Sequence, residues 1–271
     1  MDPLANIAVS AARAGGAVAL RGLNRLADLH IERKRHNDYV SEIDRRAEAV
    51  IVEAIQKVHP DHAILAEESG AAGATAGSDY QWIVDPLDGT TNYLHGFPVF
   101  SVSIAVTERG KLMHGVVYDP LREEMFVASR GRGALLNDRR IRVGQRRGLA
   151  GALIGTGFPF RDFNDLDAYL AMLRAVIETS GGVRRAGSAA LDLAWVAAGR
   201  LDGFFELGLK PWDIAAGSLL IEEAGGEFGN LSGAPGWPVA GGDILAGNPR
   251  VFAALARSLA PHLPQSARYK K

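Results

Sequence analysis

The chain has 271 residues, a formal net charge of −1 and no cysteine. Its length suits one large domain or two fused halves with a substantial core. The near-neutral charge gives no overall electrostatic reason to bind nucleic acid or membrane, and the lack of cysteine excludes disulfides, thiolate metal sites and cysteine nucleophiles. We find no signal-peptide pattern and no stretch approaching the roughly 20 apolar residues of a membrane-spanning helix. These features predict a cytoplasmic protein without a membrane segment.

The first part of the chain predicts two helices followed by strands. Asp2 and Pro3 are typical of a helix start, and apolar residues at helical spacing predict a helix to about residue 26. A second helix is predicted over residues 41–58. Residues 70–79, rich in Gly, Ala and Ser, are expected to form an exposed loop. The strands expected in this part are residues 63–66, 82–84, 99–106, 112–118 and 124–128, the last three as an antiparallel meander.

From about residue 148 the pattern changes to alternating strands and helices. Strands are predicted at residues 152–155, 202–206 and 243–246, and helices at 164–178, 188–198, 211–224 and from 249. We therefore expect an N-terminal α+β half, residues 1–147, and a C-terminal α/β half, residues 148–271.

Residues 85–91, Asp-Pro-Leu-Asp-Gly-Thr-Thr, are the most informative segment. A buried strand is expected to end at Asp85, because Pro86 cannot donate to the hydrogen-bond ladder. Asp88 then occupies the position of a helix N-cap. The two carboxylates and the Leu87 carbonyl between them offer hard oxygen ligands in a small volume, as Mg²⁺ prefers. The segment predicts a divalent-cation site.

The same segment also predicts a phosphate site. The backbone N–H groups of Gly89 and Thr90 would face the cation at the positive end of a helix, where anions bind favourably. Two aspartates at this spacing more often only cap a helix and close a turn. The complete seven-residue string is much more specific than the pair.

Three further carboxylates have a matching context. Glu67 ends a predicted strand, Asp213 lies in the first turn of a predicted helix, and Asp44 lies early in the second helix. Each alone would be read as solvated or as favourably placed at a helix terminus. Together they suit a two-metal site, of the kind that hydrolysis of a phosphate monoester needs. The seven histidines are scattered without the spacing of a zinc site, and the sequence has no P-loop and no Gly-x-Ser-x-Gly elbow.

Residues 85–92, 212–217 and 223–226 resemble the signatures of the inositol monophosphatase family. Other resembling segments are residues 37–44, 67–70, 155–160 and 184–193, so that the resemblance covers nearly the whole chain. It is strongest for the bacterial inositol-1-monophosphatase branch. It implies the layered αβαβα sandwich of sugar phosphatases, shared with fructose bisphosphatases, and a homodimer.

The resemblance implies a phosphatase that hydrolyses myo-inositol monophosphate, or a similar small polyol or sugar phosphate, with two or three Mg²⁺ ions and sensitivity to lithium. Glu67, Asp85 and the Leu87 carbonyl would bind the metal that activates the attacking water. Asp88 and Asp213, with Asp85, would bind the metal that stabilises the leaving oxygen.

The resemblance also implies roles for residues around the metals. Thr90 would orient the attacking water with support from Asp44, so that these two and Glu67 are the expected catalytic residues. The residues expected to contact substrate are Leu87, Asp88, Gly89, Thr90, Arg184, Gly187, Ser188, Ala189, Glu206 and Asp213.

Two alternatives stay open. Family relatives also act on adenosine 3′,5′-bisphosphate or histidinol phosphate, and the motifs do not separate these substrates. Residues 130–147 contain seven arginines and one acid, Asp138. A solvated strand edge is the favoured reading, over a face that binds RNA or an acidic protein. The bacterial branch is also associated with transcription antitermination alongside RNA polymerase and Nus factors, which makes a second, binding role a hypothesis.

Overall fold

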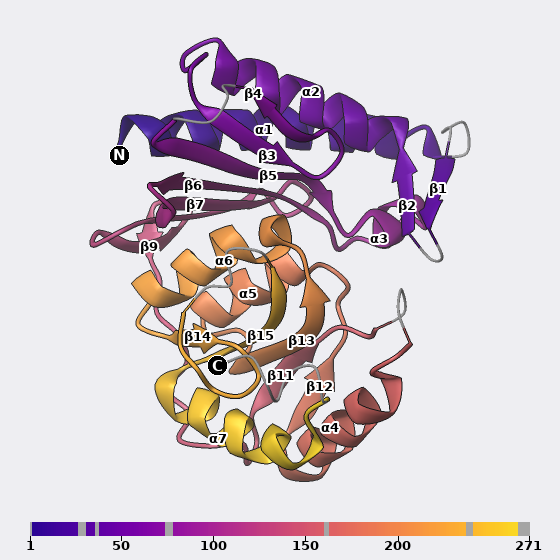
Figure 1. Cartoon of the computed structure of the whole chain (residues 1–271), viewed down its shortest axis with the longest axis vertical. Helices are drawn as coiled ribbons and strands as arrows, with labels where there is room; N and C mark the ends of the chain where they lie inside the picture. Colours follow the sequence, from indigo (N-terminus) through magenta and orange to yellow (C-terminus); the bar gives the residue numbers. More distant parts are fainter. Residues whose placement is uncertain are drawn as a thin grey trace.

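The computed structural model describes residues 2–26, 31–35, 38–73, 78–159, 163–236 and 241–264. Five layers of secondary structure are stacked in the order helices, sheet, helices, sheet, helices (Figure 1). The helices of the three helical layers are α1 (Pro3–Leu23) and α2 (Glu42–Gln56), then α5 (Ala189–Ala197) and α6 (Pro211–Glu223), then α4 (Leu166–Thr179) and α7 (Pro249–Leu259). The predicted αβαβα sandwich is therefore confirmed.

The first sheet has eight strands in the order β10-β9-β8-β7-β6-β5-β3-β4. They are β3 (Ala63–Ala66), β4 (Gly70–Gly73), β5 (Tyr80–Asp88), β6 (Ser101–Glu108), β7 (Lys111–Asp119), β8 (Glu124–Ser129), β9 (Gly133–Leu136) and β10 (Arg139–Arg140). Every neighbouring pair is antiparallel except β3 and β5, which are parallel. A separate antiparallel pair, β1 (Ile31–Arg35) and β2 (Asp38–Ser41), leads into α2.

Strand β4 replaces part of the loop expected over residues 70–79. It pairs with β3 at the edge of the sheet, with Gly70 opposite Ala66. Backbone hydrogen bonds, not alternating apolar side chains, define this strand, so the side-chain pattern carried no signal for it. Residues 74–77 of the expected loop lie outside the described part of the chain.

The second sheet has five strands in the order β12-β11-β13-β15-β14. They are β11 (Leu153–Thr156), β12 (Gly182–Arg184), β13 (Gly203–Leu209), β14 (Glu227–Gly229) and β15 (Gly242–Gly247). β11 is parallel to both of its neighbours, and the other pairs are antiparallel. Residue 148, where the boundary between the two halves is expected, lies between the last strand of the first sheet and the first strand of the second, and the division into these halves stays a prediction.

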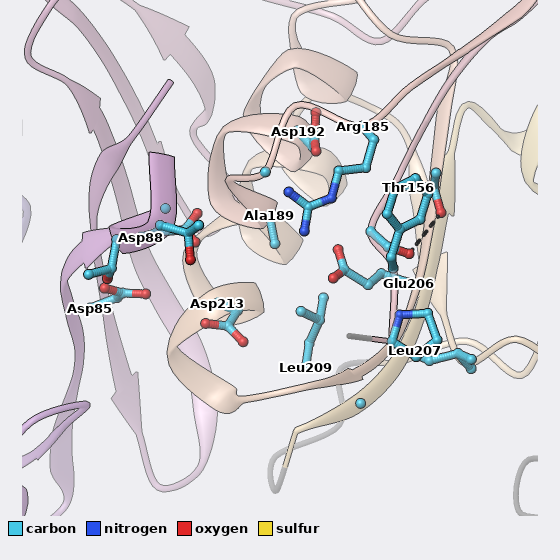
Figure 2. A pocket seen from close by; sticks show the side chains of 18 of the residues that line it. Asp85, Asp88, Thr156, Arg185, Ala189, Asp192, Glu206, Leu207, Leu209 and Asp213 are labelled. Carbon is cyan, nitrogen blue, oxygen red and sulfur yellow. Dashed lines mark hydrogen bonds between the residues drawn. The ribbon is translucent and has the colours of Figure 1, made fainter. Parts of the chain in front are cut away.

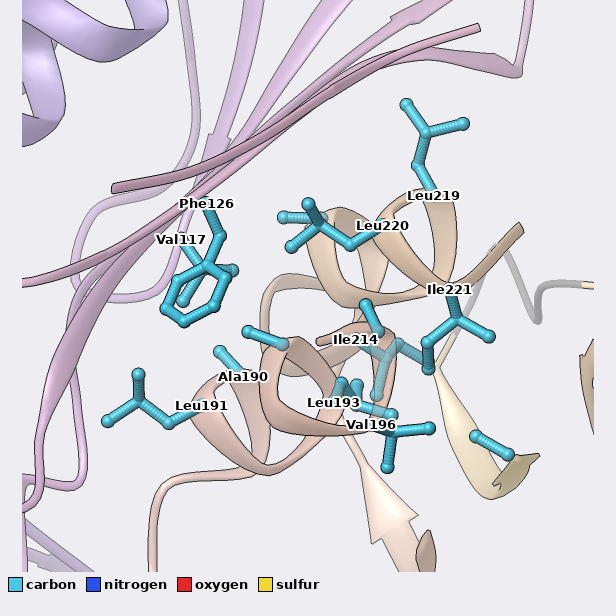
Figure 3. Close-up of a cluster of buried hydrophobic side chains, with 14 of the residues drawn as sticks. Val117, Phe126, Ala190, Leu191, Leu193, Val196, Ile214, Leu219, Leu220 and Ile221 are labelled. Atoms are coloured by element: carbon cyan, nitrogen blue, oxygen red, sulfur yellow. The ribbon is translucent and has the colours of Figure 1, made fainter. Parts of the chain in front are cut away.

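The largest apolar core fills the layer between the sheets (Figure 3). Helix α6 lies close to both of its neighbours because glycines occupy the contact points. A Cβ atom on Gly217 would lie 2.5 Å from Leu193 Cβ on α5, and one on Gly115 of β7 would lie 2.7 Å from the Ala216 carbonyl oxygen. This close packing fixes the start of α6 against the first sheet.

Helix α1 has the length and apolar composition to cross a membrane. The expectation that no stretch approaches such a segment is therefore wrong for this helix, whose hydropathy comes mainly from alanine and leucine. Its buried face nevertheless packs inside the protein, where Ala8, Ala11 and Ala12 belong to the same apolar cluster as Ile51 of α2 and Ile104 of β6. These contacts are those of a core helix.

Candidate active site

A β-bulge near the end of β5 brings two aspartates to one side of the strand. Asp85 pairs with Ser103 and Asp88 with Ser101, so β5 has one extra residue at this point. In a regular strand, residues three apart point to opposite faces, and the extra residue restores a common direction. The strand continues to Asp88, so the prediction that Pro86 ends it is wrong: the proline is accommodated in the bulge.

The helix after this strand is capped by Gly89 and not by Asp88. Gly89 has φ 96°, and α3 (Thr90–Leu94) begins directly after it. A Cβ atom at this position would lie 2.9 Å from the Val99 carbonyl oxygen and 3.2 Å from that of Gly187. Both the left-handed backbone and the crowding require glycine.

Asp88 caps a different helix from the one expected. Its Oδ2 accepts hydrogen bonds from Ser188 Oγ at 2.6 Å and from the Ala190 N–H at 2.8 Å. Ser188 is the N-cap of α5. The carboxylate at the end of the first sheet therefore binds the start of a helix between the sheets, and this contact orients it.

Asp213 reaches the same place from the first turn of α6. Its Oδ2 accepts a hydrogen bond of 2.7 Å from the Lys210 N–H, which fixes the carboxylate at the helix start. Ser103 Oγ on β6 donates to the Trp212 carbonyl at 3.0 Å and ties this turn to the first sheet. Carboxylate oxygens of Asp85, Asp88 and Asp213 all lie within 4.8 Å of one another.

The electrostatics of this cluster are those of a cation site. Burial raises the pKa of the Asp85 carboxyl well above its ordinary value. The negative charges of Glu67, Asp88 and Asp213 raise it further. A divalent cation would remove this repulsion, and a set of carboxylate oxygens with no sulfur or imidazole among them matches the preference of Mg²⁺.

Thr90 connects the cluster to α2. Its hydroxyl lies 2.9 Å from Asp44 Oδ1 and 3.1 Å from the Leu87 carbonyl oxygen. Asp44 is 1% exposed, and its other oxygen accepts hydrogen bonds from the Ser41 N–H and hydroxyl. Burial raises the pKa of Asp44, and these hydrogen bonds oppose the rise. An aspartate early in a helix is usually solvated, whereas Asp44 is buried.

A cavity of about 240 Å³ joins this cluster to the second sheet. Figure 2 shows Asp85 and Asp88 on one side of it and Arg185 and Glu206 on the other, with Asp213 between them. The predicted site residues that line the cavity are Glu67, Asp85, Leu87, Asp88, Gly89, Thr90, Gly187, Ala189, Glu206 and Asp213. Asp44 and Ser188 do not line the cavity themselves. They hold two lining residues, Thr90 and Asp88, through hydrogen bonds.

Arg184, predicted to contact substrate, does not line the cavity. Its side chain is exposed and donates to the Val183 carbonyl, and the cavity is lined by Arg185 instead. The guanidinium carbon of Arg185 lies 5.4 Å from the centroid of the Phe158 ring. Adjacent residues point to opposite sides of an extended segment, and sequence could not decide which arginine faces inward.

Two further cavity residues lie in segments that resemble the family, but they were not predicted as site residues. Gly157 lies where a Cβ atom would overlap the Glu206 carboxylate, so only glycine leaves room for that side chain. Asp192 is 1% exposed, and burial raises its pKa well above the ordinary value. The local pattern alone, a helical aspartate next to apolar residues, does not indicate that the side chain will be buried at a cavity.

The starts of three helices converge on the cavity. Thr90 begins α3, Ala189 begins α5 and Asp213 lies in the first turn of α6, and all three line the cavity. Helix N-termini carry partial positive charge, although Asp88 and Asp213 already accept N–H groups at the starts of α5 and α6. The arrangement therefore offers positive potential for an anion directly beside a cation site.

His59, Asp61 and His62 form a second group within metal-ligand distance of one another. The two imidazole rings stack with centroids 4.2 Å apart and an interplanar angle of 8°. Trp82 Nε1 donates to His62 Nδ1 at 3.1 Å and uses the lone pair of that nitrogen. With this hydrogen bond in place, His62 Nδ1 is not available to a metal.

A model of the inositol monophosphatase family matches residues 1–265. A protein of Pseudomonas aeruginosa named Nus factor SuhB is 52% identical over 269 residues, which are 98% of this chain and 99% of that protein. The crystal structure of extragenic suppressor protein suhB from Bartonella henselae has a TM-score of 0.88 at 43% identity, covering 95% of this chain and 98% of that one. An inositol monophosphatase structure from Anabaena has a TM-score of 0.82 at 40% identity, covering 97% and 98%.

The five-layer fold and its acidic cavity define a protein of the phosphatase class. The chain belongs to the inositol monophosphatase family, as its motifs predicted.

Proposed function

We propose that this protein is a Mg²⁺-dependent phosphomonoesterase that hydrolyses myo-inositol monophosphate or a similar small polyol phosphate. The observation that supports this most strongly is the cluster of Asp85, Asp88 and Asp213 oxygens within 4.8 Å of one another. It stands beside three helix N-termini, in a cavity of about 240 Å³. A cation site next to an anion site is what hydrolysis of a phosphate dianion requires.

Two or three Mg²⁺ ions would be held by Glu67, Asp85, Asp88, Asp213 and the Leu87 carbonyl. Bound ions would supply Lewis acidity, which neutralises the phosphate and stabilises the leaving alkoxide. The chain itself would hold the phosphoryl oxygens at the start of α3.

Thr90 and Asp44 are proposed to orient the attacking water. The Thr90 hydroxyl has one hydrogen, which it donates to Asp44 or to the Leu87 carbonyl. Its oxygen lone pairs are then free to accept a hydrogen bond from a water that faces the phosphorus atom. Since Asp44 is itself held by Ser41, this acceptor of the Thr90 hydroxyl is in place before substrate binds.

The far side of the cavity is proposed to bind the alcohol part of the substrate. Glu206 and Arg185 place an acceptor and donors there, which suits the hydroxyl groups of a polyol. The structure from Anabaena carries the name inositol monophosphatase, which supports an inositol phosphate as the first substrate to test.

Phosphate release from a panel of substrates tests the proposal. We expect hydrolysis of inositol 1-phosphate that requires Mg²⁺ and is lost with EDTA, with adenosine 3′,5′-bisphosphate and histidinol phosphate as competing candidates. Inhibition by lithium and a dimer in size-exclusion chromatography are the accompanying expectations. No release from any member of the panel in the presence of Mg²⁺ would refute the proposal.

A second candidate function is binding to transcription proteins or RNA. It is favoured by the Pseudomonas aeruginosa relative named Nus factor SuhB and by Arg139, Arg140 and Arg142, which are exposed at the β10 edge of the first sheet. Reversing these three charges to glutamate should weaken retention of RNA polymerase, Nus factors or RNA in a pull-down, with hydrolysis unchanged. Unchanged retention would remove this surface from consideration.

A further inference from the structure

Helix α2 carries a second buried carboxylate one turn after Asp44. Glu48 is 5% exposed and lies on the same face of the helix, four residues further along. Asp44 reaches Thr90, whereas Glu48 reaches the loop between β3 and β4. The two acids of α2 therefore contact two different segments that line the cavity.

The contacted loop is the one that carries Glu67. Ala66 of β3 pairs with Gly70 of β4, so Glu67, Glu68 and Ser69 form the hairpin loop. The Glu67 N–H donates to the Val84 carbonyl of β5 at 3.1 Å. This bond holds the first loop residue beside the strand that delivers Asp85.

The next two N–H groups of the loop are taken by Glu48. The Glu68 N–H donates to Glu48 Oε2 at 2.8 Å, and the Ser69 N–H donates to Oε1 at 2.9 Å. Hydrogen bonds to an ionised acceptor are about twice as strong as neutral ones. Both oxygens of one carboxylate are used, so the loop is held in position and in orientation.

We infer that Glu48 is a positioning residue that sets the affinity of the site for its metal by fixing the loop of Glu67. The inference rests on the proposed function, in which Glu67 is a metal ligand. Groups that orient metal ligands through hydrogen bonds typically contribute about 10- to 100-fold to metal affinity or activity. Glu48 acts on Glu67 through the backbone of the two residues that follow it, without touching the cavity.

Calorimetric titration of the metal-free full chain with MgCl₂ tests this directly, without a reaction. In Glu48→Gln, the side-chain N–H₂ faces one of the loop N–H groups, so one hydrogen bond is lost while shape is kept. We expect Mg²⁺ to bind this variant at least about tenfold more weakly. Glu53→Gln, on the exposed side of the same helix, is the matched control and should bind as the wild type does.

Thermal melting separates positioning from a general structural role. A lower melting temperature of Glu48→Gln with wild-type Mg²⁺ affinity would overturn the inference. If Glu48→Gln does not fold, Glu48→Asp replaces it as the test variant, because its shorter carboxylate cannot reach both N–H groups. Wild-type Mg²⁺ affinity in Glu48→Asp would likewise overturn the inference. If the wild type itself binds no Mg²⁺, the proposed function fails, and this inference fails with it.

Discussion

The Asp88 carboxylate accepts a 2.6 Å hydrogen bond from the Ser188 hydroxyl, 100 residues later in the chain. Asp88 ends a strand of the first sheet, and Ser188 caps a helix that lies between the two sheets. The same carboxylate accepts the Ala190 N–H. The direction of a proposed metal ligand from the first half is therefore set by the second half, so the site exists only when both are folded together.

Replacing Asp88 with asparagine should abolish catalysis and keep the fold. The amide oxygen can still accept from Ser188 or from Ala190, whereas the charge that would bind the metal is lost. We expect turnover to fall by more than about 100-fold with inositol 1-phosphate. Asp138→Asn is the matched control, since Asp138 is exposed in a turn with φ 64°, a conformation that asparagine tolerates. Near wild-type phosphate release by Asp88→Asn, with a folded protein, would contradict the assignment.

Replacing Thr90 with valine removes the hydroxyl at nearly constant volume. If the hydroxyl orients the attacking water, kcat should fall about 10²- to 10⁴-fold, while Mg²⁺ binding measured by calorimetry stays the same. Thr90→Ser keeps the hydroxyl and should retain most of the activity. Equal losses in Thr90→Val and Thr90→Ser would show that the methyl group, not the hydroxyl, matters.

Adding a methyl group at Gly157 should weaken substrate binding alone. The new Cβ atom would overlap the Glu206 carboxylate and push it away from its place in the cavity. We expect kcat/KM for inositol 1-phosphate to fall by about 10- to 100-fold, mainly through KM, with unchanged Mg²⁺ affinity. Gly148→Ala, where the new atom has no neighbour within 4 Å, should behave as the wild type. A wild-type KM in Gly157→Ala would mean that Glu206 does not contact the substrate.

Asp192 should make stability depend on pH. Burial raises its pKa well above the ordinary value of 3.8, and the negative charges of Glu206 and Asp88 raise it further. Because the folded-state pKa is the higher one, the stability contribution is complete below about pH 3.8 and is lost as pH rises through the folded-state value.

Asp192→Asn removes this loss. Its melting temperature should equal that of the wild type near pH 4 and exceed it by at least about 2–4 °C near pH 8. The difference between the two proteins isolates Asp192, because all other titrating groups are common to both. A difference that does not change with pH would show that Asp192 is not the group responsible.

Local features of the chain were readable from sequence where one short segment decides the structure. Helices α4, α5 and α6 begin and end within two residues of their predicted bounds. The caps Asp2 and Ser41 are where the sequence predicts them. Periodicity and capping act over one or two turns, so a single sequence contains all the information needed for them.

The chemistry of the site was also present in the sequence, as hard oxygen ligands in a strand–turn–helix segment. Tertiary structure alone decided where those ligands point. The bulge at Pro86 turned Asp85 and Asp88 to one side, Arg185 and not Arg184 came to face the cavity, and Glu48 came to hold the loop of Glu67. Each of these outcomes depends on a neighbour that is distant in the chain or on the exact twist of a strand, and local side-chain patterns do not encode either.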